Sequence, residues 1–407
     1  MRNREILISG GSVAGPALAY WLRRHGFSPT VVERAPAPRT GGQAIDVRGA
    51  ALEVVDRMGL LAEVRAAATA MRGMSYVDSA GRELVRLTDL TLTGGPVDGP
   101  DVELMRDDLV ELLYRVTRDG VEYRFDDSIA ALREGPDGVH VDFERGGSRR
   151  FDLVIGADGL HSRVRALAFG PESDYLHHLG TYLSVCSAPN LLELDHWQLF
   201  HLAEGRMVAV YSARHNTESR IMFGFRSERL DIDHRDVEAQ RLLIADTFAG
   251  LGWRGEELLA AMWRSRDFYL DSMSQVRMPS WCTGRIGLVG DAGYGPSPLS
   301  GQGTSLALVG AYVLAGELAR AGGEHTEGFA AYQRAMAGYV QLNQRLALGP
   351  AKRGTTRFAN WRAVQLLRLL NVLPWRRRMI ELAMRPLRRA ADGIELPHYG
   401  ALVREGG

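Results

Sequence analysis

The first 33 residues of this 407-residue chain leave few choices of fold. The apolar run Glu5 to Ser9 predicts a buried strand, a glycine-rich turn covers residues 10 to 15, and residues 16 to 25 have helical periodicity. Thr30 to Glu33 predicts a second strand that ends in an acidic side chain. Because two parallel strands need a crossover between them, this order predicts a βαβ unit and an α/β fold with a parallel sheet.

The turn and the acidic residue indicate the dinucleotide-binding version of this unit, and a plain βαβ unit without a ligand is the alternative. Small residues let the backbone approach a pyrophosphate, and the helix N-terminus favours the charge of that group. A carboxylate about twenty residues after the turn accepts a hydrogen bond from a ribose. Ser12 replaces the middle glycine of the common motif, which makes the approach less free. The predicted contacts are Gly10, Gly11, Ser12, Ala14, Gly15, Glu33 and Arg34, the last of which is equally well explained as a solvated arginine.

A second strand–loop–helix pattern occurs in the last third of the chain. Ile286 to Val289 predicts a buried strand, and Asp291 follows it where a carboxylate can reach a ligand. After a loop rich in Pro and Gly, Thr304 to Ala321 predicts a long helix. Gly301 and Gly303 allow the loop backbone to approach a ligand, and the helix N-terminus points at it. Such a site suits a flat, electron-accepting ring that becomes anionic when reduced; packing without a ligand is the alternative.

Three charged positions between these patterns lie where the chain turns. Asp46 follows two glycines in the segment GGQAIDVRG and alternates with Arg48, as ligand contacts or as a surface salt bridge. Arg106 stands just before a predicted helix, as a ligand contact or as a partner of a neighbouring acid. Asp158 lies in a tight turn after another predicted strand, and Ser162 is the candidate N-cap of the helix that follows.

Longer alternating strands are predicted between about residues 172 and 275, and large aromatic residues concentrate there. Tyr211, Phe223 and Phe225 fall on neighbouring strands, and the last two share one face because side chains alternate along a strand. Aromatic side chains on a sheet line an apolar pocket or belong to an ordinary core. We expect the substrate to lie between this face and the loop at Pro298, with these four residues as its contacts.

Composition and cysteine usage narrow the partners and the compartment. The formal net charge is zero, which argues against nucleic acid. The two cysteines, Cys186 and Cys282, have no metal-ligand spacing, so no metal is predicted and a reducing, cytoplasmic location is expected. His161 is expected to face solvent. No signal peptide or membrane span is recognised, and we interpret the arginine runs at 376–378 and 388–389 as a helix face packed across the body rather than a membrane surface.

Taken together, the motifs resemble those of group A flavoprotein monooxygenases, the FAD-dependent aromatic hydroxylases similar to para-hydroxybenzoate hydroxylase. The resemblance rests on the N-terminal glycine motif with Glu33, on Asp158-Gly159 with Arg165, and on Gly290-Asp291 with the loop Pro298 to Gly303. It covers the chain to about residue 345. The GGQAIDVRG segment and the lack of a C-terminal thioredoxin-like domain make the chain similar to the tetracycline-inactivating branch and to related polyketide-tailoring enzymes.

The resemblance implies a domain plan and a role for each motif. It predicts a Rossmann-like FAD-binding domain with the para-hydroxybenzoate hydroxylase fold, an antiparallel β-sheet substrate domain and C-terminal helices. The FAD-binding domain is predicted to comprise residues 1–72, 100–171 and 276–345. The substrate domain comprises residues 73–99 and 172–275, and the C-terminal helical segment comprises residues 346–407. By resemblance Glu33 holds the adenosine ribose, Arg106 contacts the flavin side, and Asp291 binds the ribityl chain. Asp158 and Arg165 support the FAD cradle and a transient nicotinamide cofactor, and the covering loop adds Pro298, Gly301, Gln302, Gly303 and Thr304.

Two departures from the family pattern affect the flavin edge. The common GDAAH sequence is Gly290-Asp291-Ala292-Gly293-Tyr294 here, and a frequent acidic residue in the following helix is Gly310. The usual Asn after the glycine loop is Ser305. These changes leave FAD binding as the expectation and leave the substrate open.

The implied activity is hydroxylation of an aromatic or polyketide-like small molecule by an FAD-dependent monooxygenase. NADPH or NADH would reduce FAD, O2 would add at flavin C4a, and the resulting hydroperoxide would transfer OH to an electron-rich ring. Because the cofactor performs this chemistry, no catalytic side chain is predicted. Baeyer–Villiger oxygenation or an FAD-dependent reduction on the same scaffold are alternatives, and so is a non-catalytic flavoprotein that sequesters a ligand. The oligomeric state is left open.

Overall fold

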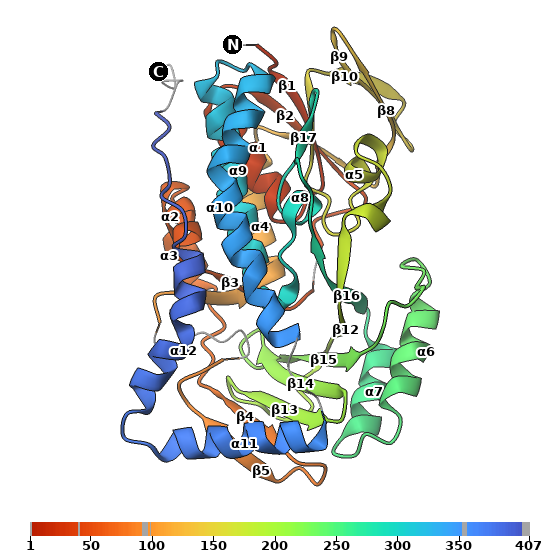
Figure 1. Ribbon diagram of the computed structural model, residues 1–407. Helices are drawn as coiled ribbons and strands as arrows, with labels where there is room; N and C mark the ends of the chain where they lie inside the picture. Colours follow the sequence, from red (N-terminus) through yellow and green to blue (C-terminus); the bar gives the residue numbers. More distant parts are fainter. Residues whose placement is uncertain (1, 40, 92–96, 98, 352–355, 401–407) are drawn as a thin grey trace.

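The computed structural model describes residues 2–39, 41–91, 97, 99–351 and 356–400 (Figure 1). Its fold is mixed α/β, with a largely parallel sheet at one end and a large, mainly antiparallel sheet at the other. Among the described residues, no helix combines the length and the hydropathy needed to cross a bilayer.

The parallel sheet contains both strands that the N-terminal pattern predicts. Its six strands follow the order β17-β18-β11-β1-β2-β7, and only the β17–β18 pairing is antiparallel. Ile6, Leu7 and Ile8 of β1 are fully buried because α1 (Ala14–Arg24) packs against this central strand and β10 (Ser148–Phe151) contacts it as well. The strands are β1 (Glu5–Ser9), β2 (Ser28–Glu33), β7 (Glu122–Phe125), β11 (Leu153–Gly156), β17 (Cys282–Thr283) and β18 (Ile286–Leu288).

Helices pack around this sheet, and the longest of them run side by side in Figure 1. α1 packs against α9, and α9 packs against α10, so the two glycine-containing motifs of the sequence belong to one body. The helices of this part are α1 (Ala14–Arg24), α2 (Ala50–Arg57), α3 (Leu61–Ala66), α4 (Arg106–Thr117), α5 (Arg163–Ala168), α8 (Asp291–Tyr294), α9 (Gly303–Arg320) and α10 (His325–Ala351).

The five short strands between residues 122 and 156 are divided between two sheets. β7 and β11 join the parallel sheet, beside β2 and β1. Only β8 (Ile129–Gly135), β9 (Gly138–Phe143) and β10 (Ser148–Phe151) pair as a three-stranded antiparallel sheet. A separate two-stranded sheet joins β3 (Ala44–Val47) to β6 (Val102–Met105).

The large sheet has seven strands in the order β16-β12-β15-β14-β13-β4-β5, and only the β4–β13 pairing is parallel. Residues 74 to 87 therefore cross from the first part of the chain into this sheet. The strands are β4 (Met74–Val77), β5 (Glu83–Leu87), β12 (Leu176–Pro189), β13 (Gln198–Ala203), β14 (Arg206–Ala213), β15 (Glu218–Arg226) and β16 (Tyr269–Val276).

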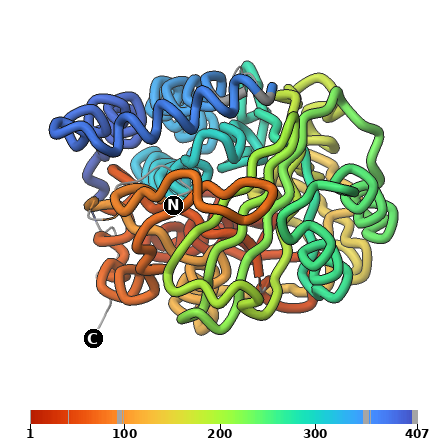
Figure 2. The backbone as a smooth tube through the Cα atoms, turned by 90° about the horizontal axis from the view of Figure 1, so that it is seen from below, coloured from red at the N-terminus to blue at the C-terminus, as the bar shows by residue number. Residues whose placement is uncertain are grey.

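Both faces of the large sheet are covered. α6 (Val237–Phe248) and α7 (Gly255–Arg264) pack on one face, and α11 (Arg357–Val372) packs on the other face near β5 and β13. Figure 2 shows these helices on opposite sides of the green strands. α12 (Arg376–Ala391) then returns the chain to α10. This arrangement places the start of α9 between the parallel sheet and the α11-side face of the large sheet.

Candidate functional site

The N-terminal glycine turn is held too tightly for larger residues. Gly10 has a φ of +113°, and a Cβ there would lie 2.4 Å from the carbonyl oxygen of Ala157. A Cβ on Gly15 would lie 1.9 Å from the Gly10 oxygen. α1, which begins here, has neither a side-chain N-cap nor an acidic residue in its first turn. Its first N–H groups can therefore bind an external anion such as a pyrophosphate.

Glu33 ends β2 next to this turn, and its orientation is fixed by the backbone. Its carboxylate accepts hydrogen bonds from the N–H groups of Gly11 at 2.7 Å and Ala35 at 2.9 Å. Arg39 lies 3.5 Å from the same carboxylate, a partner that the sequence motif does not reveal. Arg34, by contrast, is exposed. Glu33 is thus already oriented where the motif places a ribose contact.

The second glycine segment is fixed in place by α4 and the large sheet. Gly41 donates its N–H to Asp107 at 2.9 Å, and Ala44 donates its N–H to the Tyr211 hydroxyl at 2.8 Å. Arg220, only 1% exposed, donates from Nε to the carbonyl oxygen of Gly42 at 3.0 Å. Sequence reasoning missed Asp107 and Arg220; the signal for Arg220 was a lone charge in the apolar strand ESRIMFGFR.

The position of the Arg106 side chain depends on this placement of the glycine segment. A Cβ on Gly42 would lie 3.0 Å from its Nε, so only glycine lets the guanidinium lie over the loop. Burial lowers the pKa of Arg106, and the nearby groups that oppose this shift include Tyr269 and Asp291. Desolvation by the surrounding protein likewise raises the pKa of the Asp291 carboxyl, although solvent still reaches this side chain, and Arg106 acts against that rise. Tyr269 at the start of β16 is 51% exposed, and Asp291 is exposed too. The three side chains thus form a polar group that solvent reaches at the junction of the two sheets.

Asp46 and Arg48 form an ion pair at 2.9 Å, but this pair is buried rather than on the surface. Arg48 also lies 3.6 Å from Asp101, and its N–H donates to the Ser305 hydroxyl in α9 at 3.2 Å. The pair therefore links β3 to the first turn of α9. A cofactor contact by Asp46 stays a prediction.

The loop before α9 is strained and ends at an open helix N-terminus. Ser297 has a φ of +76°, which is unfavourable for a residue with a Cβ, and Gly301 is left-handed at +63°. α9 has no side-chain N-cap and no acid in its first turn. Gln302 is fully buried, and its amide nitrogen and oxygen have no hydrogen-bond partner among the described residues. Gly303 leaves the space between this helix start and Asp291 free of side chain.

The turn that carries Asp158, together with Arg165, supports the segment around Asp291. Asp158 accepts hydrogen bonds from the Ser162 hydroxyl and the Val164 N–H, and burial raises the pKa of its carboxyl. Ser162 is confirmed as the N-cap of α5. Arg165 is fully buried and donates to the carbonyl oxygen of Ala292 at 2.9 Å, next to Asp291. In the structure Arg165 thus fixes the segment that carries Asp291.

The three aromatic residues expected to line one substrate wall lie on two different faces of the sheet. Phe223 and Phe225 pack under α6 against Phe248, at ring-centroid distances of 5.1 and 6.3 Å. Tyr211 lies on the opposite face and belongs to the cluster that contacts Leu299 of the loop. The expected single wall is wrong. Tyr211 lies opposite Arg220 in the sheet and therefore shares its face, whereas Phe223, three residues further along β15, points to the other face. The face that meets the loop is built mainly from aliphatic residues and Met, and its aromatic members are Tyr211, Phe200 and Tyr76.

The geometry of this region fits a bound FAD. Two uncapped helix N-termini, α1 and α9, approach the same strand ends, since a Cβ on Gly290 would lie within 3.5 Å of residues in both helices. One suits a pyrophosphate, and the other suits a ring that gains negative charge. The glycines at 10, 15 and 42 leave no room for larger side chains; Glu33 ends β2, and Asp291 begins α8 shortly after β18.

Comparisons with known proteins agree with this geometry. The family model described as "FAD binding domain" matches residues 3–335. An uncharacterized protein of Mycobacterium tuberculosis is 55% identical over 84% of this chain and 92% of its own length. A flavin-dependent monooxygenase of Legionella longbeachae is 42% identical over 85% of this chain and 88% of its own. The crystal structure of tetracycline destructase Tet(51) is 35% identical, with a TM-score of 0.86 over 98% of this chain and 100% of that one. The chain therefore belongs to the FAD binding domain family and is an FAD-dependent monooxygenase of the aromatic-hydroxylase type.

Proposed function

We propose that the enzyme uses NADPH or NADH and O2 to hydroxylate a planar aromatic or polyketide-like small molecule. The observation that carries this proposal is the contact between the loop at Leu299 and the apolar α11-side face of the large sheet. The loop brings the open end of α9 to that face, so a polar cofactor region and an apolar wall meet at one place.

The apolar side of this site has the composition that a fused-ring substrate needs. Leu183, Met207 and Met222 lie on this face, and Val364 of α11 packs into the same cluster. A Cβ on Gly224 would lie 3.2 Å from the terminal carbon of Met207, so glycine keeps the sheet surface flat beside it. Methionine side chains adapt to irregular shapes, which suits a large apolar ligand. We assign substrate binding to this face in place of Phe223 and Phe225.

The chain's own part in the reaction is binding, orientation and charge stabilisation. Bound FAD supplies electron transfer from the nicotinamide and the activation of O2. The free N–H groups at the start of α9 and the guanidinium of Arg106 stabilise negative charge on the cofactor ring. Asp291 accepts hydrogen bonds from the cofactor's hydroxyl groups, and Arg165 keeps that carboxylate in position through Ala292. The apolar wall excludes water from the reacting ring.

The choice of substrate class draws on the neighbouring structure that is named a tetracycline destructase. We therefore propose a polycyclic aromatic polyketide rather than a single-ring acid. The test is to measure NADPH and NADH oxidation by the FAD-loaded enzyme with a panel of tetracyclines, fused-ring phenols and single-ring phenols. We expect fused-ring compounds to stimulate oxidation and to give a product that has gained one oxygen atom. A ring-expanded lactone, a reduced product or no stimulation by any compound would refute the proposed reaction.

A further inference from the structure

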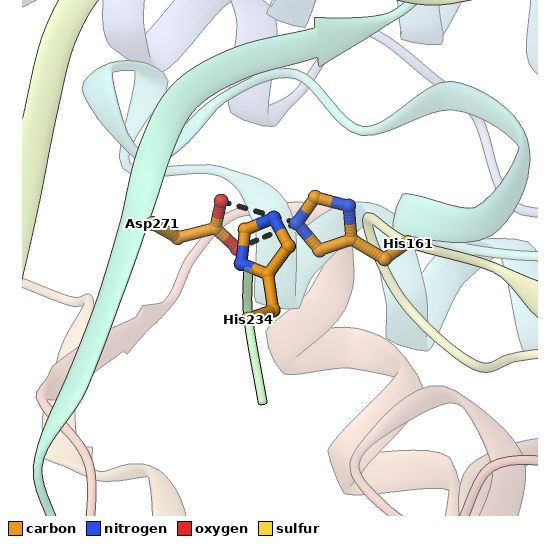
Figure 3. Close-up of side chains that lie close together, drawn as sticks. All are labelled: His161, His234 and Asp271. Carbon is orange, nitrogen blue, oxygen red and sulfur yellow. Dashed lines mark hydrogen bonds and ion pairs between the residues drawn. The ribbon is translucent and has the colours of Figure 1, made fainter. Parts of the chain in front are cut away.

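Three titratable side chains from segments far apart in the chain converge at one place. His161 lies in the turn before α5, Asp271 lies on β16, and His234 lies in the segment before α6 (Figure 3). The Nε2 atom of His161 is 3.1 Å from both carboxylate oxygens of Asp271. The ring centroids of His161 and His234 are 4.0 Å apart, and each of the three residues offers one ligand atom within 4.8 Å of those of the other two.

We propose that His161, His234 and Asp271 form a binding site for one divalent transition-metal ion such as Zn²⁺. Two imidazoles and one carboxylate are a ligand set that zinc accepts, with ligand bonds of about 2.0–2.2 Å. Such bonds place neighbouring ligand atoms about 3.3 Å apart, close to the 3.1 Å between His161 and Asp271. A sequence scan for ligand spacing misses this site because the three residues are far apart in the chain.

Hydrogen bonds outside the three ligands already hold two of them in position. Glu172 lies 3.0 Å from Nδ1 of His161, so the ring can donate from Nδ1 and present Nε2 to the ion. The Tyr269 hydroxyl donates to Asp271 at 2.6 Å, and the N–H of Ser272 donates to its other oxygen at 2.7 Å. A carboxylate–histidine pair of this kind raises the basicity of the ligand and fixes its orientation. Metal binding would displace the proton that His161 shares with its carboxylates.

The third ligand and the open side of the site are accessible. His234 is exposed and belongs to residues 227–236, which form no helix or strand, so its side chain can rotate toward an ion without displacing a helix or strand. A cavity of about 480 Å³ adjoins the cluster and is lined by His161, His234, Glu172 and Ser272, among others. It leaves room for a water molecule as fourth ligand. Bound metal would tie the 227–236 segment to β16 and to the turn that carries Asp158.

The test is zinc binding to the full-length, FAD-loaded protein after treatment with a chelator. Equilibrium dialysis against Zn²⁺ with metal analysis should give one zinc per chain. His234→Ala should weaken zinc binding at least about tenfold while flavin content stays unchanged. His177→Ala is the matched control, because His177 is an exposed histidine on neighbouring β12 that lies outside the cluster. Glu172→Gln should weaken affinity but keep the stoichiometry, as expected for a residue that positions a ligand.

Two results would overturn the site. Wild-type protein that binds no more zinc than His234→Ala would show that the cluster is only an ion pair. Equal losses in His177→Ala and His234→Ala would show that the zinc is held by surface histidines in general. As a second measurement, zinc should raise the melting temperature of the wild type and not that of His234→Ala, because only ligands of the folded state stabilise it.

Discussion

Replacing Phe223 by alanine tests which face of the large sheet meets the substrate. Phe223 is fully buried, and its ring packs edge-to-face on Phe248 of α6 at a centroid distance of 5.1 Å. Removing a phenylalanine in such a core costs about 3–5 kcal/mol of unfolding free energy, because the side-chain contacts are lost and a cavity remains. In a thermal melt of the FAD-loaded protein this corresponds to a drop of roughly 4–6 °C for a chain of 407 residues. Substrate affinity of the folded fraction should not change.

Met222→Ala is the matched variant, since Met222 is the adjacent residue on β15 and lies on the opposite face. It is 7% exposed, so its loss also destabilises the protein, by about 2–5 kcal/mol. Unlike Phe223→Ala, it should also weaken substrate binding, measured by titrating the flavin absorbance with substrate. If Phe223→Ala raised the dissociation constant for substrate as much as Met222→Ala, the assignment of the two faces would be refuted.

Four further predictions concern the cofactor region. Glu33→Ala removes a charge-assisted hydrogen bond and should weaken FAD binding by about 1.5–3 kcal/mol, or about 10- to 100-fold, measured by flavin release on dilution. Asp291→Asn should lower FAD content. Because desolvation raises the pKa of this carboxyl in the folded state, the wild-type apoprotein should lose stability relative to this variant as pH rises above the ordinary value of 3.8. Melting temperatures of the two apoproteins at several pH values measure this difference. Tyr211→Phe leaves a buried N–H of the glycine loop without its acceptor, which should cost about 1–3 kcal/mol and reduce FAD retention without changing the substrate range. Gly310→Ala should destabilise the protein by about 1–3 kcal/mol, and Tyr294→Phe, which removes the clashing hydroxyl, should relieve most of that loss in a double-mutant cycle.

The cofactor half of the molecule could be predicted from sequence because its signals are local. A buried strand, a glycine turn and a helix specify one another within about thirty residues, and the handedness of the crossover leaves one arrangement. Gly10 and Gly15 could be assigned for the same reason, since their neighbours in space are also near in sequence or belong to the adjacent strand. The position of Glu33 at the end of β2 followed directly from where the apolar run stops, whereas Asp291 lies beyond the end of β18, as the first residue of α8.

The substrate half depended on long-range pairing, and there the prediction was wrong. Alternation along β15 correctly puts Phe223 and Phe225 on one face, but it does not say which layer covers that face. The answer depends on α6 and α7, which pack there, and on a strand register that places Tyr211 opposite Arg220. Arg220 was missed for a related reason. Its partner, the carbonyl oxygen of Gly42, lies 178 residues away in the chain.

The departures from the family pattern at positions 294 and 310 are explained by one contact. Tyr294 directs its hydroxyl toward α9, where a Cβ on Gly310 would lie 2.0 Å from that oxygen. The same hydroxyl accepts a hydrogen bond from Tyr332 at 2.8 Å, and Tyr332 is also within 3.1 Å of the carbonyl oxygen of Leu288. An acidic side chain at 310 would clash with the Tyr294 hydroxyl, and a histidine at 294 would remove the hydroxyl that Tyr332 contacts. The two departures therefore form one repacked unit next to Asp291, which fills the core with a tyrosine pair and meets α9 at Gly310, away from the uncapped first turn of that helix.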